Sequence, residues 1–84
     1  MSAVLDSPHR FVTAPAYGSF RPEPPDVVTS EGEWVESGQL LGTITSSDGD
    51  VPIVSPWRGW VVAYLVGDGE RVRPGIELVH VVEA

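Results

Sequence analysis

The chain repeats itself, and this repeat limits its fold more than any other feature. The stretch "EGEWVESGQLLGTI" at 31–44 aligns with "DGERVRPGIELVHV" at 68–81, an offset of 37 residues. Upstream, "APAYGSF" at 14–20 aligns with "SPWRGWV" at 55–61, an offset of 41 residues. Neither copy is long enough to bury an apolar face alone, so the repeat predicts two interlocked halves related by a pseudo-two-fold axis.

Each half is predicted to consist of short strands. Apolar residues alternate or run in short bursts that Gly or Pro separates, and no uninterrupted window of 11 residues carries an apolar stripe at helical spacing. We therefore expect an all-β chain that forms a flattened barrel of two four-stranded halves. The first copy has four extra residues, and we place them in the proline-rich segment "RPEPP" at 21–25.

The segment "TITSSDGDVPIVSP" at 43–56 reads as a hairpin with an Asp-Gly turn. Asp-Gly is a preferred dipeptide for a two-residue turn that needs positive φ, and Asp50 beside the turn would keep its tip solvated. The alternative interpretation is a recognition tip that presents Asp48 to a partner. Two nearby carboxylates without a longer ligand run do not predict a calcium site.

Composition excludes several classes of function. The 84 residues include no cysteine, so disulfides, thiolate metal sites and cysteine nucleophiles are absent. The net charge of −7 and the lack of a basic cluster argue against nucleic acid as a partner. With neither a long apolar run nor a signal-peptide pattern, we expect no membrane association and a cytoplasmic location. All five basic residues are arginines, so chemistry that needs a side-chain amine is closed to this chain.

The repeated pattern resembles a known family. The order P-x-x-G, then G-[DE]-x-V-x-x-G-x-x-L, then a hairpin ending in Ser-Pro, is similar to that of biotinyl/lipoyl carrier domains. The resemblance implies a barrel-sandwich hybrid of about eight strands over residues 9–84, with a loosely ordered N-terminus at 1–8. The stretch "GSFRPEPPD" at 18–26 further resembles the biotin carboxyl carrier domain, which implies a short proline-rich projection, the thumb, at 21–26.

The resemblance also shows what is missing. In that family, a lysine at the tip of the central hairpin carries biotin or lipoate through an amide. An ungapped alignment places Asp48 at the acceptor position, and the chain has no lysine that a shift of register would supply. A carboxylate cannot form this amide, so we expect no cofactor.

Aromatic side chains are the other candidate site. Trp60, Val62 and Tyr64 are expected on one face of the strand at 60–66, with Val61, Ala63 and Leu65 on the core face. Such rings either cover an end of the small barrel or form a binding patch. The predicted partner-binding residues are Trp34, Trp57, Trp60, Tyr64, Arg21 and Asp48.

Two histidines and several serines offer weaker alternatives. His9 and His80 are expected on neighbouring strands, but only Glu83 is available as a third ligand, so no metal site is predicted. The serines lack a nucleophile-elbow motif and an orienting acid, so no hydrolytic triad is predicted.

These observations predict a protein that is not an enzyme. The expected function is that of an unbiotinylated, carrier-like domain acting as a protein-binding or assembly component, with an acyl-CoA carboxylase-like or other multisubunit enzyme as its partner. The alternative is a small carrier or small-molecule-binding protein whose group is held between aromatic rings or esterified on Ser46 or Ser47. Self-association through the Trp60/Tyr64 face is a third expectation.

Overall fold

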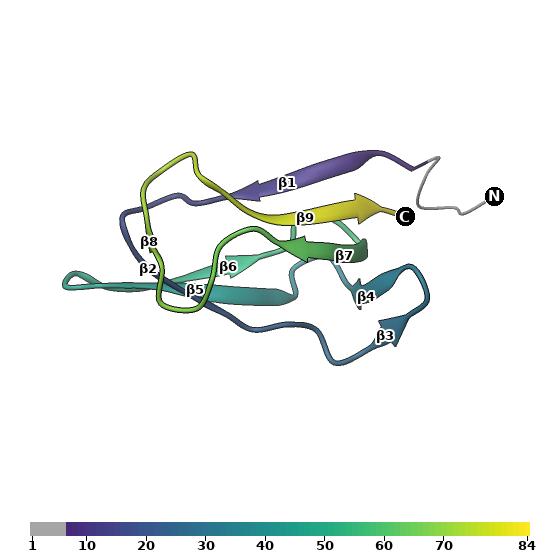
Figure 1. The fold of residues 1–84 in the computed structure, drawn as a ribbon, viewed down its shortest axis with the longest axis horizontal. Helices are drawn as coiled ribbons and strands as arrows, with labels where there is room; N and C mark the ends of the chain where they lie inside the picture. The colour runs from purple at the N-terminus through teal and green to yellow at the C-terminus, as the bar shows by residue number, and fades with distance from the viewer. Residues whose placement is uncertain (1–6) are drawn as a thin grey trace.

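The computed structural model describes residues 7–84, and in that range the regular secondary structure consists of strands joined by turns and loops (Figure 1). Residues 1–6 of the predicted N-terminal segment lie outside the described residues, while the Pro8 carbonyl accepts a hydrogen bond from the Glu83 backbone N–H. No helix able to cross a membrane is found in the described part. The strands are β1 (His9–Thr13), β2 (Gly18–Pro22), β3 (Val28–Thr29), β4 (Gly32–Val35), β5 (Leu40–Ser46), β6 (Gly49–Val54), β7 (Gly59–Tyr64), β8 (Arg71–Val72) and β9 (Glu77–Glu83).

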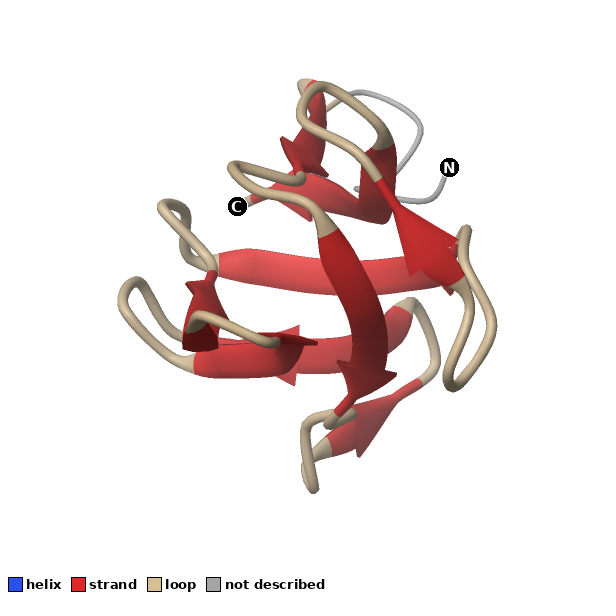
Figure 2. Cartoon of the chain, turned by 90° about the vertical axis from the view of Figure 1, so that its left-hand side faces the viewer, coloured by secondary structure: helices blue, strands red, loops and turns tan. Residues whose placement is uncertain are grey.

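The strands form two antiparallel sheets, and equivalent strands of the repeat lie in different sheets (Figure 2). The five-stranded sheet has the order β1-β9-β7-β4-β3, and the four-stranded sheet has the order β6-β5-β2-β8. The repeat offsets make β1 equivalent to β6, β2 to β7, β4 to β8 and β5 to β9. The first four strands of the five-stranded sheet, β1-β9-β7-β4, therefore correspond in the same order to the four-stranded sheet, β6-β5-β2-β8. Each sheet takes two of these strands from each half of the chain. This arrangement confirms the predicted all-β barrel of interlocked halves.

The repeated positions also supply the core between the sheets. Alternate residues of the strands point inward, and the equivalent residues of the two halves are buried in one apolar cluster. The pairs are Phe20 and Val61, Val35 and Val72, Leu41 and Leu78, and Ile44 and Val81.

The proline-rich segment differs from the expectation in its position. Arg21 and Pro22 belong to β2 and lie opposite Thr43 and Gly42, and the Glu23 N–H continues the pairing with the Leu41 carbonyl. The extra residues of the first half therefore fall within 23–31, where β3 pairs with β4 at the edge of the five-stranded sheet. β3 is the one described strand without an equivalent in the other half.

The predicted alternation in β7 is wrong beyond Val61. The register of β7 against β9 shifts between Val61 and Ala63, which places an extra residue, Val62, on the bulge. Because a one-residue shift exchanges the two faces, Tyr64 packs against the core and Leu65 is 46% exposed, the reverse of the expectation.

Candidate functional site

The β5–β6 hairpin projects from one end of the molecule and places Asp48 at its tip (Figure 1). Ser46 pairs with Gly49, so Ser47 and Asp48 form the two-residue loop, one residue earlier than the predicted Asp-Gly turn. Neither loop residue has positive φ; Gly49, with φ of 119°, takes that conformation. Asp48 is exposed, and no acceptor amine exists at the tip.

Ser46 closes the hairpin turn. Its hydroxyl donates a hydrogen bond to the Gly49 carbonyl (3.2 Å) and accepts one from the Asp48 N–H (3.2 Å). These bonds hold the backbone of the loop in place, so residue 48 is presented in a defined conformation. Of the two serines considered as ester acceptors, Ser46 is thus engaged in the turn, and Ser47 is the exposed loop residue.

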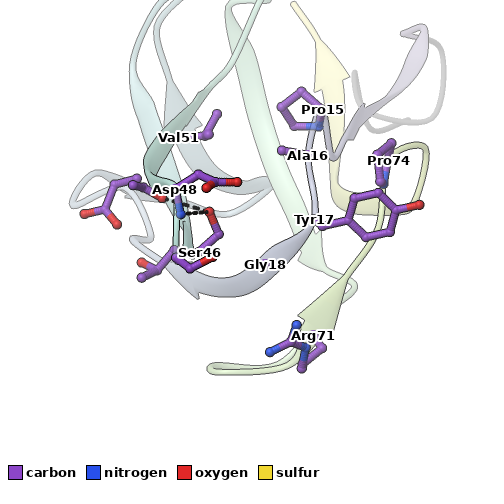
Figure 3. Close-up of a pocket in the computed structure, with 13 residues that line it drawn as sticks. Pro15, Ala16, Tyr17, Gly18, Ser46, Asp48, Val51, Arg71 and Pro74 are labelled. Atoms are coloured by element: carbon purple, nitrogen blue, oxygen red, sulfur yellow. Dashed lines mark hydrogen bonds between the residues drawn. The ribbon is translucent and has the colours of Figure 1, made fainter.

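A cleft of about 590 Å³ lies between this hairpin and the β1–β2 connection (Figure 3). Ser46, Asp48 and Val51 form the hairpin side, while Tyr17 and Pro74 lie across the opening and Arg71 lies at one end. Tyr17 is 70% exposed. Sequence reasoning missed Tyr17 and Arg71 as lining residues. The repeat could have indicated them, because Tyr17 is equivalent to Arg58 and Arg71 is equivalent to Trp34. Each half therefore has one aromatic ring and one arginine at these two positions, in opposite order.

Trp34 and Trp60 come together on the outer face of the five-stranded sheet. They lie opposite each other on β4 and β7, with ring centroids 5.4 Å apart in an edge-to-face arrangement. Next to Trp60 in the register is Val82, which is fully buried yet outside the core cluster between the sheets. Trp60 and His9, its two cross-strand neighbours, flank Val82 on this outer face.

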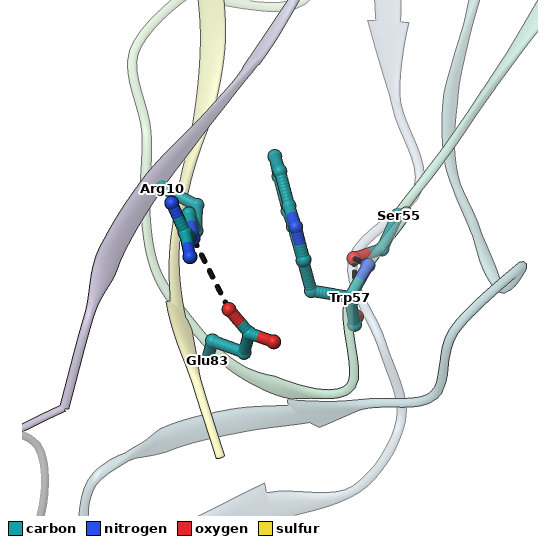
Figure 4. A network of polar contacts seen from close by, with 4 residues as sticks. All are labelled: Arg10, Ser55, Trp57 and Glu83. Atoms are coloured by element: carbon teal, nitrogen blue, oxygen red, sulfur yellow. Dashed lines mark hydrogen bonds and ion pairs between the residues drawn. The ribbon is translucent and has the colours of Figure 1, made fainter.

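Trp57 lies elsewhere, beside β1 (Figure 4). The Arg10 guanidinium stands 6.0 Å from its ring centroid and forms an ion pair with Glu83 at 3.1 Å. The Ser55 hydroxyl donates to the Trp57 carbonyl (2.6 Å) and accepts from the Trp57 N–H (3.2 Å), which fixes the backbone of Trp57. The ring borders an apolar groove of about 320 Å³ between the edge strands β1 and β6.

The remaining predicted contacts lie apart from the tryptophans. Tyr64 is half-buried, and its hydroxyl donates to the Leu41 carbonyl (2.9 Å). Burial, with the negative charges of Glu33 and Glu23 as smaller causes, raises the pKa of the Tyr64 phenol. Arg21 is exposed on the four-stranded sheet. The structure thus brings together Trp34 and Trp60 but distributes the other predicted contact residues over different surfaces.

His9 and His80 are neighbours, as predicted. Nδ1 of His9 and Nε2 of His80 are 2.8 Å apart, and Phe11 stacks on the His80 ring with centroids 4.8 Å apart. No cluster of three His, Cys, Asp or Glu side chains suited to a metal ion occurs in residues 7–84, and Glu83 pairs with Arg10 instead. Burial and, to a smaller extent, the nearby His9 lower the pKa of His80, while Glu77 opposes this shift.

The lowered pKa of His80 predicts a fall in stability on mild acidification. The unfolded chain binds the proton more readily than the folded chain. The contribution of neutral His80 to the free energy of unfolding is therefore fully present above the ordinary pKa of 6.5 and is lost as pH falls below it. Urea denaturation between pH 7.5 and 5.5 is expected to show a decreasing free energy of unfolding. The variant His80→Thr, which carries the residue at the equivalent position 43, should show a flatter profile. Stability that rises on acidification in this range would contradict the assignment.

Comparison with known proteins supports the fold. No protein-family model matches the chain, and no curated protein matches it. Among solved structures, it resembles part of a single-chain, multi-domain long-chain acyl-CoA carboxylase, with a TM-score of 0.73 and 20% sequence identity. The fold is a barrel-sandwich hybrid. The match covers 90% of this chain but only 7% of the carboxylase chain, so the likeness concerns one small part of that protein.

Proposed function

We propose that this chain is a carrier-like domain that bears no biotin or lipoate and serves as a protein-binding component of an acyl-CoA carboxylase-like or other multisubunit enzyme. One observation carries the proposal: the projecting hairpin has Asp48 at its tip in a chain without lysine. An amide to biotin or lipoate needs an amine nucleophile, and a carboxylate is the wrong reaction partner. The fold shared with part of an acyl-CoA carboxylase supports the choice of partner class.

The hairpin end is the surface that we propose the enzyme contacts. Asp48 and Tyr17 are exposed there, on two sides of the cleft of about 590 Å³. An enzyme that encloses the tip gains contacts from both the hairpin and the β1–β2 connection. The tip supplies negative charge where a carrier domain supplies its lysine, so the contact would be recognition without group transfer.

The same cleft favours a second candidate function, the binding of a small molecule. Its volume lies within the range of ligand pockets, and the Tyr17 ring and Arg71 guanidinium provide an apolar surface and a cation. Native mass spectrometry separates the two candidates. A ligand that is retained under native conditions and lost on denaturation supports the second candidate and counts against the first.

Affinity capture tests the first candidate. The protein, an Asp48→Arg variant and an Asp26→Arg control are immobilised in parallel and exposed to native extract. Both aspartates are exposed, so neither change should disturb the fold, and Asp26 lies in the β2–β3 connection. We expect the protein and the control to enrich a carboxylase-type enzyme subunit about 10-fold over the Asp48→Arg variant. Equal capture by all three, or no such enzyme, would refute the proposal.

A further inference from the structure

The outer faces of the two sheets are chemically opposite although their strands are equivalent. On the five-stranded sheet, the outer face carries Phe11, Trp34, Trp60, Val62 and His80, which we call the aromatic face. The repeat offsets give the matching residues of the four-stranded sheet. In the same order, these are Pro52, Arg71, Ser19, Arg21 and Thr43.

This internal comparison shows that the fold does not require the rings. The four-stranded sheet keeps the same strand order and pairing with a mostly polar outer face, so rings are not needed there to close the barrel. Trp60 and His9 flank the buried Val82, but Phe11 and Val62 remain 41% and 37% exposed. Exposed apolar residues gathered on one face indicate an interaction surface.

Two opposite charges lie beside Trp34 on the aromatic face. The Trp34 indole N–H donates to Glu36 at 2.6 Å, and the Arg58 guanidinium stands 5.2 Å from the same ring. One carboxylate and one cation thus lie beside the same indole, while the whole chain has a net charge of −7. The Arg58 cation reduces the repulsion between two copies whose surfaces meet at this indole.

The opposite charges of Arg58 and Glu36 allow two copies of this face to pair. Arg58 and Glu36 both contact the same indole, so a two-fold rotation can bring the Arg58 of one copy toward the Glu36 of the other. At strand spacings of ~4.8 Å and a rise of ~3.3 Å per residue, five short strands present about 400 Å² per copy. This area lies below that of standard interfaces, so the association would be weak and reversible.

We propose that the aromatic face binds the aromatic face of a second copy, forming a symmetric dimer. The hairpin with Asp48 lies on other strands, in the four-stranded sheet, so both copies keep it available. Dimer formation through the aromatic face therefore does not depend on the proposed function of the hairpin. A dimer without a captured enzyme, and a captured enzyme without a dimer, are distinguishable results.

Sedimentation equilibrium over a range of concentrations tests the dimer. The apparent mass is expected to rise from 9.0 kDa toward twice that value as the protein concentration increases from micromolar to near-millimolar. The Val62→Arg and Trp34→Arg variants introduce the residues found at the equivalent positions 21 and 71. Since those residues are tolerated on the other sheet, the variants should fold but dissociate at least 10-fold more readily.

A Tyr17→Ser variant is the matched control, because it removes a 70% exposed ring from a different surface. This variant should self-associate like the unchanged protein, and circular dichroism should show that all variants are folded. A constant mass of 9.0 kDa at every concentration would overturn the proposal. Undiminished dimerisation of folded Val62→Arg would overturn it as well. Capture of a different protein by the aromatic face of a monomeric chain would assign the surface to that partner and reject the dimer.

Discussion

An Asp48→Lys variant is expected to accept one biotin from a biotin–protein ligase, whereas the unchanged protein should accept none. Residue 48 occupies the second position of the exposed hairpin loop, and the bonds of Ser46 hold this loop in place. An amine there would project clear of the sheet, which is the geometry that an amide-forming ligase requires according to the resemblance to carrier domains. The expected effect is all-or-none, and intact mass spectrometry after incubation with ligase, biotin and ATP measures it.

An Asp50→Lys variant provides the control for position. Asp50 lies only two residues away, but it belongs to β6 and pairs with Thr45, so a lysine there does not stand at the tip. It should remain unmodified under the same conditions. If Asp48→Lys stays unmodified, or if both variants are modified equally, position 48 does not reproduce the acceptor site.

Replacing Gly59 by alanine is expected to destabilise the domain severely. Gly59 begins β7, and an added Cβ would overlap the Val82 carbonyl oxygen and stand 3.0 Å from Ala84 N and Glu83 Cα. All of these are backbone atoms of the β9 end of the chain, so β7 and β9 would have to separate. We expect a loss of about 3 kcal/mol or more, which corresponds to a fall in Tm of about 15 °C.

Gly67→Ala is the matched control for this substitution. Gly67 is exposed, and its added Cβ would meet only the Glu70 carboxylate at 3.7 Å. Its free energy of unfolding should stay within about 0.5 kcal/mol of the unchanged protein. Thermal and urea denaturation of both variants measure the difference. A Gly59→Ala protein as stable as Gly67→Ala would show that β7 and β9 do not approach as closely as described.

The repeat made most of the fold predictable, because equal spacing of apolar residues and glycines dictates equivalent strands. It predicted neither β3, which lies in the unmatched insertion, nor the bulge at Val62. A bulge changes which side chains point inward without altering the local residue pattern, so Tyr64 and Leu65 exchanged their expected faces. The hairpin turn shifted by one residue because Gly49 can take positive φ within the first pair of β6.

The candidate site was less predictable than the fold. Asp48 was identifiable because a single hairpin and the absence of lysine determine what its tip carries. The cleft beside it depends on Tyr17 and Arg71, which are distant in the sequence and come together only through the pairing of β2 with β8. Trp34 and Trp60 meet through pairing between the two halves, and composition alone does not define such contacts.

The central claim is that the hairpin holds no covalently attached group, and mass spectrometry of the peptide that contains residues 43–50, from protein purified from its native source, tests it directly. The expected result is a peptide mass that the amino acids account for completely. A heavier peptide, with the additional mass mapped to residues 43–50 by fragmentation, would show that the tip carries a group after all and would contradict the account.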